Sequence, residues 1–234
     1  MKAFLILALI LAITGCTDDT DPPWQLDHDR IIAIRATPPR IDSGDRAVID
    51  GLRGAKGAPL SEGAPDQVTV LSPASLVDTV AHDAGKWTIT APGAAQLAAA
   101  RTELGLAAGA PVPLSIEASY GTLRATKTVW LGATSANPAM AGIEIDRAAA
   151  PPEATELVIP PLVDVPMSIG LSDADYDVTW LTSCGTMHDF DLPSAYVHVK
   201  ADDPMAGQLA LVVRDANGGV SWEIWPIRAT APPP

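Results

Sequence analysis

Short runs of β-branched and aromatic residues recur along the chain at roughly ten-residue spacing, with Pro and Gly in the gaps between them. This spacing is typical of a β-sandwich or barrel, in which strands are short and each turn needs a special backbone conformation. In the first half the runs are Arg30–Arg35, Ala47–Ile49, Val68–Leu71, Trp87–Thr90, Leu114–Glu117 and Leu123–Trp130. Apolar residues make up 47 % of the sequence, enough to bury a core, so wholesale disorder is excluded. The pattern predicts an all-β fold.

One Ala-rich stretch interrupts the β pattern. Between Pro92 and Gly105, Leu97 and Leu104 lie seven residues apart, which places both on one face of a helix. Pro before the stretch and Gly after it are signals for the start and the end of a helix. We expect a helix of about 12 residues that covers one end of a sandwich.

A small, polar, Pro-containing segment, residues 134–141, divides the chain into two halves of similar plan. The second half contains about seven further strand-like runs in about 90 residues, close to the size of one compact sandwich. They are Ile143–Ile145, Leu157–Ile159, Met167–Ile169, Val178–Leu181, Ala195–Val199, Leu209–Arg214 and Val220–Ile227. We therefore expect one sandwich over residues 28–133, a second over residues 142–230, and a Pro-rich tail at 231–234. The two halves form a weak internal repeat.

The last two runs are joined by Asn217-Gly218, the strongest two-residue signal for a hairpin, because a type I′ turn needs positive φ at both positions. This turn sets Val213 opposite Trp222. It also sets Leu211 opposite Ile224, so one face of the hairpin is wholly apolar and is expected to point inward.

The opposite face of this hairpin then carries Trp225. A three-residue loop would instead set Val213 against Ser221 and Leu211 against Glu223, which mixes apolar and polar residues. Because burial of the apolar set fixes the register, the two-residue loop is preferred. Trp225 is expected to cover the interface with the first sandwich, to stack on a sugar ring or to dock on a partner.

The first 15 residues are expected to be a signal peptide. Met1-Lys2 is followed by an uninterrupted apolar run of 11 residues, shorter than the ~20 that a membrane-spanning helix needs. The run ends in Ile13-Thr14-Gly15-Cys16, which resembles a bacterial lipobox. The resemblance implies that Cys16 is alkylated on sulfur, acylated by chains such as palmitate, and becomes the mature N-terminus. The alternative is an ordinary signal peptide in which this Cys is incidental.

Residues 16–27 are expected to form a lipid-anchored acidic linker, because Asp18, Asp19, Asp21, Pro22 and Pro23 leave little apolar area to bury. Two or three acyl chains hold far more firmly than one, so the membrane is a permanent partner. In lipoproteins, Asp directly after the lipidated Cys resembles an inner-membrane retention signal. Here Thr17 stands at that position, which favours the outer membrane of a bacterial cell envelope.

The closing segment of the second half resembles a known family of domains. Leu211–Gly219 (LVVRDANGG) resembles the closing hairpin of PKD-like and other bacterial Ig-like domains, and Val178–Trp180 resembles their strand bearing a core Trp. Arg30–Leu52 is similar to the opening of Ig-like domains in bacterial surface lipoproteins. The resemblance implies two tandem Ig-like sandwiches and carries no catalytic residues. The chain lacks the paired Cys of antibody-type domains, because the only Cys besides Cys184 is Cys16, which is expected to carry the lipid.

Charge and Cys content exclude several classes of function. The net charge of −13, which becomes −14 once Lys2 is removed with the signal peptide, argues against nucleic acid as a partner. Two Cys exclude a disulfide-stapled scaffold and a Cys-rich zinc site. No G-x-S-x-G, H-E-x-x-H or phosphate-binding Gly-rich loop occurs, and we expect neither an enzyme nor a cofactor.

Two groups of side chains are weak candidates for chemistry. Asp173, Asp175 and Asp177 alternate along a loop, and three carboxylates at this period can converge on Ca²⁺, although solvated loop acids are the commoner explanation. Cys184 and His188 could form a nucleophile and base only if the chain turns back at Gly185, because four extended residues span ~13 Å. A buried structural thiol is the preferred interpretation.

The leading hypothesis is a lipid-anchored protein with an adhesion, scaffold or partner-binding role, whose partner is a protein or a glycan. A second hypothesis is a carbohydrate-binding module that stacks sugars on an exposed Trp225 or Trp87. A third is a Ca²⁺-dependent surface module around the three Asp.

Overall fold

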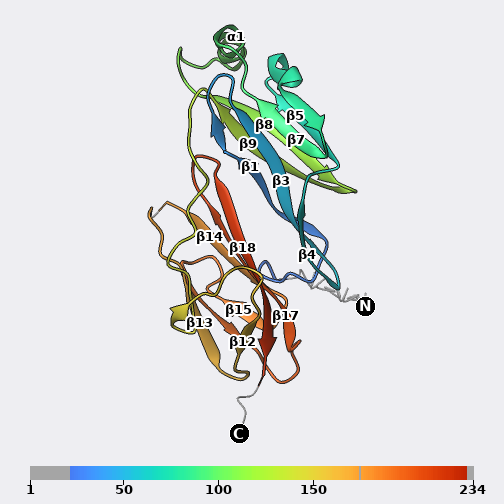
Figure 1. Ribbon diagram of the computed structural model, residues 1–234, viewed down its shortest axis with the longest axis vertical. Coiled ribbons are helices and arrows are strands. Elements are labelled where there is room, and N and C mark those ends of the chain that lie inside the picture. Colours follow the sequence, from blue (N-terminus) through green and yellow to red (C-terminus); the bar gives the residue numbers. More distant parts are fainter. Residues whose placement is uncertain (1–21, 174, 231–234) are drawn as a thin grey trace, which may run out of the picture.

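The computed structural model describes residues 22–173 and 175–230, and within them the chain forms two β-sandwiches placed end to end (Figure 1). The expected signal peptide at residues 1–15, the expected lipidation site Cys16 and the tail at 231–234 lie outside the described residues. No helix in residues 22–173 and 175–230 is long and apolar enough to cross a membrane.

The first sandwich consists of two sheets, with strand orders β1-β3-β7-β6, to which β4 adds beside β3, and β2-β9-β8-β5. The strands of the first sheet are β1 (Arg30–Thr37), β3 (Arg46–Ala55), β4 (Ala58–Gly63), β6 (Val80–Asp83) and β7 (Lys86–Thr90). The strands of the second sheet are β2 (Arg40–Ile41), β5 (Gln67–Ser72), β8 (Val112–Tyr120) and β9 (Leu123–Leu131). Alternate residues of β8 are buried, as expected for a strand that turns one face to a core.

Two helical segments accompany this sandwich, a 3₁₀ helix η1 (Ala74–Thr79) and an α-helix α1 (Ala94–Leu104). The predicted helix is confirmed. It ends at Gly105, whose φ of 66° provides the left-handed cap that a side chain would resist. The helix buries Leu97 and Ala100 against the core and lies across the end of the first sandwich, as Figure 1 shows.

The second sandwich repeats this plan, with strand orders β11-β10-β13-β16-β15 and β12-β18-β17-β14. The first of these sheets contains β10 (Glu144–Ile145), β11 (Ala148–Ala149), β13 (Asp164–Ser168), β15 (Thr186–His188) and β16 (Ser194–His198). The second contains β12 (Leu157–Ile159), β14 (Asp177–Thr182), β17 (Ala206–Arg214) and β18 (Val220–Ala229).

The two sandwiches match strand by strand. In each, a short strand near the start, β2 or β12, pairs in parallel with the last strand, β9 or β18. The remaining pairs are antiparallel. One sheet has the order β1-β3-β7-β6 in the first sandwich and β10-β13-β16-β15 in the second, and the other sheet has the order β9-β8-β5 in the first and β18-β17-β14 in the second. This is the division of an Ig-like sandwich. The predicted all-β fold of two tandem Ig-like domains is confirmed.

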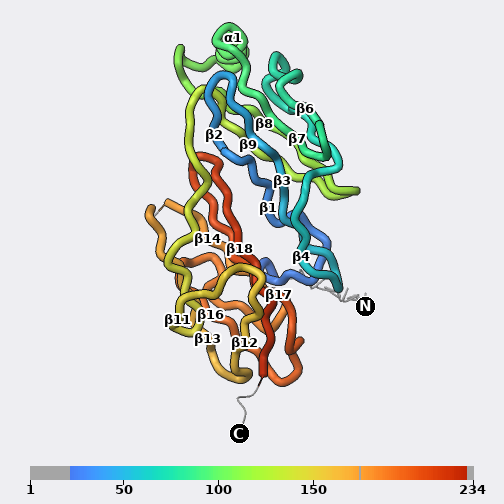
Figure 2. Tube along the Cα trace, in the orientation of Figure 1, coloured from blue at the N-terminus to red at the C-terminus, as the bar shows by residue number. Residues whose placement is uncertain are grey.

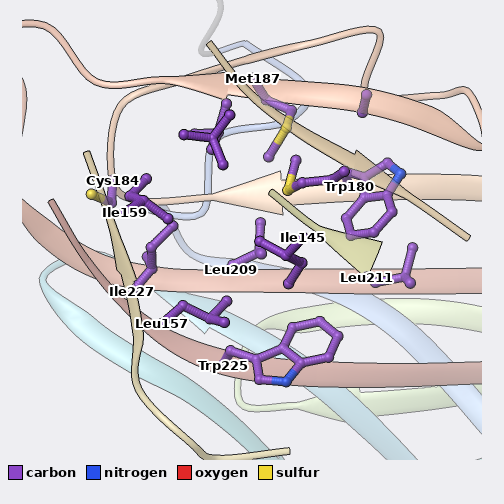
Figure 3. Close-up of a cluster of buried hydrophobic side chains, with 14 of the residues drawn as sticks. Ile145, Leu157, Ile159, Trp180, Cys184, Met187, Leu209, Leu211, Trp225 and Ile227 are labelled. Atoms are coloured by element: carbon purple, nitrogen blue, oxygen red, sulfur yellow. The ribbon is translucent and has the colours of Figure 1, made fainter. Parts of the chain in front are cut away.

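Each sandwich has its own apolar core between its two sheets. In the second sandwich Trp180 and Trp225 are fully buried, and Figure 3 shows them among side chains from β10, β12, β15 and β17. Trp180 lies on β14, the strand for which the family resemblance implied a core Trp. The first core contains no Trp that is fully buried and is filled by aliphatic residues and by Tyr120.

Candidate functional site at the interdomain seam

The closing hairpin has a different register from the predicted one. Leu209 lies opposite Trp225, Leu211 opposite Glu223 and Val213 opposite Ser221. This is the register of the three-residue loop, so the prediction of a two-residue turn at Asn217-Gly218 is wrong.

The side chain of Asp215 explains the longer loop. Its Oδ1 accepts the N–H of Asn217 at 2.7 Å and the N–H of Gly219 at 2.7 Å. The backbone N–H of Asp215 also donates to the Gly219 carbonyl at 3.1 Å. Gly218 takes φ of 84°, the left-handed residue that follows a type I turn in three-residue hairpins. The Asx turn of Asp215 therefore outweighs the Asn-Gly signal.

The shifted register exchanges the positions of two Trp. Trp225 was expected to point outward, but it is fully buried in the core of the second sandwich, where its Nε1–H donates to the Pro151 carbonyl at 3.0 Å. A fully buried indole offers no face to a sugar or a partner. Trp222, expected in that core, points instead toward the first sandwich. The expectation failed because the register was chosen by requiring apolar residues on one face only, whereas both faces of this hairpin are covered, one by the core and one by the first sandwich.

An apolar cluster joins the two sandwiches. We call it the interdomain seam and define it by the buried side chains Leu26, Ala33, Leu52, Leu181, Ala210, Val212, Val220 and Trp222. They come from the N-terminal segment, from β1 and β3 of the first sandwich, and from β14, β17 and β18 of the second. At the middle of the molecule β1 contacts β18 and β4 contacts β17, and Figure 2 shows these strands side by side. Both faces of β17 are therefore buried, one in the core and one in the seam.

Polar contacts surround Trp222 at this seam. Its Nε1–H donates to Glu62 Oε1 at 2.6 Å, and the guanidinium carbon of Arg35 lies 3.8 Å from its ring centroid. Arg35 is itself held by Asp50 through two bonds, from Nε at 3.1 Å and from Nη2 at 2.6 Å. A cation placed over an indole face adds about 1 kcal/mol to the contact. Residues of the first sandwich thus bind both the edge and the face of this one ring.

The expected linker also contacts both sandwiches. Asn137 Nδ2 donates to the Ala36 carbonyl at 3.0 Å, and Asn137 Oδ1 accepts the N–H of Val220 at 2.9 Å. Next to it, Ser221 Oγ donates to the Pro138 carbonyl at 2.7 Å. A single amide side chain therefore bridges β1 and β18 across the seam.

The N-terminal segment differs from the expected solvated linker. Trp24 and Leu26 lie along β14, where Thr182 N–H donates to the Trp24 carbonyl at 2.9 Å and Leu26 N–H donates to the Thr182 carbonyl at 3.0 Å. Leu26 is 3 % exposed. The three Asp and two Pro at residues 18–23 led to the prediction of a solvated linker. The apolar residues Trp24 and Leu26 that follow them bury enough apolar surface to pack against the second sandwich.

The predicted calcium site is not assembled among the described residues. The calcium hypothesis requires the carboxylates of Asp173, Asp175 and Asp177 to converge, and no group of three His, Cys, Asp or Glu suited to a metal occurs in residues 22–173 and 175–230. Asp173 Oδ1 instead accepts the N–H of Asp175 at 3.0 Å, which closes the loop on itself. These side chains are exposed loop acids.

The candidate pair of Cys184 and His188 is also kept apart. Cys184 is fully buried in the core, and burial raises the pKa of its thiol. His188 is exposed on the opposite side of its strand, where its ring stacks on Tyr196 with centroids 4.5 Å apart. A buried neutral thiol without a neighbouring base is a structural side chain.

Trp87, the second candidate for sugar stacking, is half-buried. Its Nε1–H already donates to the Pro65 carbonyl at 2.9 Å, and the ring of His82 lies 4.7 Å away at a tilt of 32°. None of the six Trp, all of which lie in the described residues, is exposed. The stacking hypothesis required a flat and solvent-exposed indole.

Sequence reasoning missed two cations near the seam, Lys127 and Arg214. Lys127 is 8 % exposed and donates to the Gly218 carbonyl. Arg214 Nη2 donates to the Ile32 carbonyl at 2.8 Å. The sequence pattern could have indicated that Lys127 is buried, because it alternates with Val129 and Leu131 at inward-facing positions of β9.

No protein-family model and no curated protein matches the chain. Several solved structures do match. The tandem Ig repeats of Dlar are 12 % identical and cover 88 % of this chain and 100 % of theirs, with a TM-score of 0.32. Titin domains Z1Z2, solved in complex with telethonin, are 13 % identical over 88 % of this chain and 98 % of theirs, with a TM-score of 0.25. Fibronectin(III)-like modules of Clostridium thermocellum CbhA are 12 % identical over 85 % and 95 %, with a TM-score of 0.30.

The strand order of both sandwiches defines the chain as a tandem of Ig-like β-domains. A fold of this class does not define a function by itself. The seam is the contact through which the two domains are joined.

Proposed function

We propose that this chain is a lipid-anchored, non-catalytic protein of the bacterial cell envelope with an adhesion, scaffold or partner-binding role. The observation that supports the role is the interdomain seam. Apolar packing, the contacts to Trp222 and the bridge through Asn137 all join the two sandwiches. A joined pair of domains presents loops from both ends at defined separations, as a protein that engages a partner requires.

The proposal of an anchor comes from the N-terminal sequence. Ile13-Thr14-Gly15-Cys16 follows an apolar run of signal-peptide length, and Thr17 after the Cys favours the outer membrane. The acidic body repels anionic lipid, so acyl chains rather than a protein face would hold the molecule at the membrane.

The anchor is tested with the two Cys of the chain as a matched pair. Cells that express the wild type, Cys16→Ser or Cys184→Ser are labelled with radioactive palmitate and then fractionated. We expect label and membrane association in the wild type and in Cys184→Ser, and neither in Cys16→Ser. Mass spectrometry that finds a free thiol on residue 16 of the processed wild type contradicts the anchor.

The partner-binding role is tested by mild crosslinking on intact cells, with Cys16→Ser as the control for location. We expect the wild type to form a discrete crosslinked species that Cys16→Ser does not form. Protease shaving of the same cells reports whether the domains face the periplasm or the exterior. A wild type that stays uncrosslinked at every crosslinker length contradicts the role.

A further inference from the structure

A small cavity lies where the closing hairpin of the second sandwich meets the open side of the first. Its volume is about 270 Å³. It is lined by Ile31, Ile32, Ala33, Ile34, Ala125, Thr126, Lys127, Thr128, Arg214 and Val220. The lining thus combines β1 and β9 of one domain with β17 and β18 of the other.

Two cations line this cavity from different domains, Lys127, which is buried, and Arg214, which is half-buried. The ammonium of Lys127 donates to the Gly218 carbonyl, which uses one of its three donors. The guanidinium of Arg214 donates from Nη2 to the Ile32 carbonyl at 2.8 Å and from Nη1 to Thr179 Oγ1 at 3.3 Å, which uses two of its five. Donors therefore remain on both groups.

Neither cation forms an ion pair with a carboxylate in the described part of the chain. The lining contains no Asp or Glu, although the whole chain carries a net charge of −13. Asp215 and Asp177 act on the two cations only through longer-range attraction. A buried cation without a counter-charge is costly, and the cost falls when an anion occupies the space beside it.

The backbone around the cavity is open as well. β1 is the edge strand of its sheet, and β9 is paired on its outer side only through Trp130 and Leu131. A bulge at Ile32 interrupts the pairing of β1 with β3 beside the Arg214 contact. Bulges of this kind are common where a strand turns a group toward a site.

We propose that this cavity binds a small oxyanion, of the carboxylate or phosphate type, between the Lys127 ammonium and the Arg214 guanidinium. The volume suits such a group and is below the 300–1,000 Å³ of typical drug-sized sites. Because one cation belongs to each sandwich, the bound anion strengthens the junction between them. The inference is independent of lipid anchoring.

The anion supports the charged form of both groups. The pKa of Lys127 is lowered to about 8, because burial lowers it strongly, the attraction of Asp215 opposes part of this shift, and the nearby positive charge of Arg214 adds a smaller lowering. At pH 7 the ammonium is still protonated. An anion in the cavity raises this pKa again, so binding is strongest below pH 8.

The test uses the processed full chain, purified in detergent, and inorganic phosphate as the probe at pH 7. Thermal melts in phosphate, in acetate and in chloride are compared at matched ionic strength, and titration calorimetry provides Kd. At ten times Kd we expect phosphate or acetate to raise Tm by about 3 to 6 °C over chloride. A shift with acetate identifies a carboxylate site, and a shift with phosphate alone identifies a phosphate site.

Three variants locate the effect. Lys127→Met is expected to weaken binding at least tenfold. Ala125→Glu places a carboxylate at a half-buried position of the lining, on the face of β9 that carries Lys127; it tests the site if Lys127→Met does not fold, and is expected to abolish binding. Arg124→Met is the matched control, because Arg124 lies on the same strand, pairs with Glu117 and is absent from the lining.

Two results overturn the proposal. If neither anion shifts Tm relative to chloride, Lys127 and Arg214 only hold the two domains together. If Ala125→Glu responds to the anions as the wild type does, the anion binds elsewhere.

Discussion

Replacing Trp222 and Trp225 one at a time by Ala distinguishes the interdomain seam from the core of the second sandwich. Trp222 is 5 % exposed at the seam, and Trp225 is fully buried three residues further along the same strand. Each substitution removes one indole, so the two variants match in chemistry and differ in the surface that they damage. The register observed in the hairpin predicts different outcomes for them.

The magnitudes follow from the contacts. Loss of a buried Trp costs about 3 to 5 kcal/mol. Trp222→Ala also loses the bond to Glu62 and the stacked guanidinium of Arg35, worth about 1 kcal/mol each, so we expect a total loss of about 5 to 7 kcal/mol. Trp225→Ala leaves the Pro151 carbonyl without its donor, and we expect about 4 kcal/mol.

Differential scanning calorimetry separates the two effects. Because Trp222 couples the domains, Trp222→Ala is expected to split unfolding into two transitions, one for each sandwich. Trp225→Ala is expected to lower the transition of the second sandwich alone and to leave that of the first unchanged. If Trp225→Ala is nearly neutral and Trp222→Ala collapses only the second sandwich, the hairpin has the two-residue turn and the reasoning is refuted.

Two further predictions concern single side chains. Lys127 has a folded pKa of about 8 against an ordinary value of 10.5, so between these pH values the unfolded chain holds one more proton and stability rises with pH. In phosphate-free buffer, we expect the free energy of unfolding of the wild type to rise by about 2 kcal/mol relative to that of Lys127→Met between pH 8 and 10, as measured by urea unfolding. A difference between the two proteins that does not change with pH contradicts the buried cation. Gly185→Ala is expected to cost about 3 kcal/mol or more, because φ is 79° and a Cβ would lie 2.5 Å from the His198 carbonyl oxygen. Gly57→Ala has a φ of 69° with nothing within 4 Å and should cost about 1 kcal/mol, and equal urea midpoints for the two variants would show that the close approach is unimportant.

The sequence was sufficient for the fold class and the main strands because these depend on local patterns. β8 shows buried residues at every second position, and α1 ends at the Gly that marked its end. The short strands β2 and β11 were missed because two residues carry no periodicity and are defined only by their neighbours. The strands β4, β6 and β15 were missed as well, because together they bury a single side chain and so show no apolar alternation. Fold prediction succeeded where one segment contained the whole signal.

The site was not predictable in the same way, since it depends on what covers a surface. Leu209–Val213 is a run of five buried apolar residues, a pattern typical of a strand covered on both faces. Treating it as a one-faced strand led to the wrong register and exchanged Trp222 with Trp225. The turn could not be predicted from the Asn-Gly pair alone, because its length depends on the hydrogen bonds that the Asp215 side chain accepts from the loop backbone.

The attachment of the N-terminal segment to β14 determines how the molecule responds to mechanical load. The guanidinium of Arg30 also holds this segment, because it donates hydrogen bonds to the carbonyls of Pro23 at 2.9 Å and Gln25 at 2.8 Å. A force applied to the amino end therefore acts on the middle of the molecule, between the two sandwiches (Figure 1). It first breaks the short pairing of this segment with β14. Tension would detach the segment before it unfolded either domain.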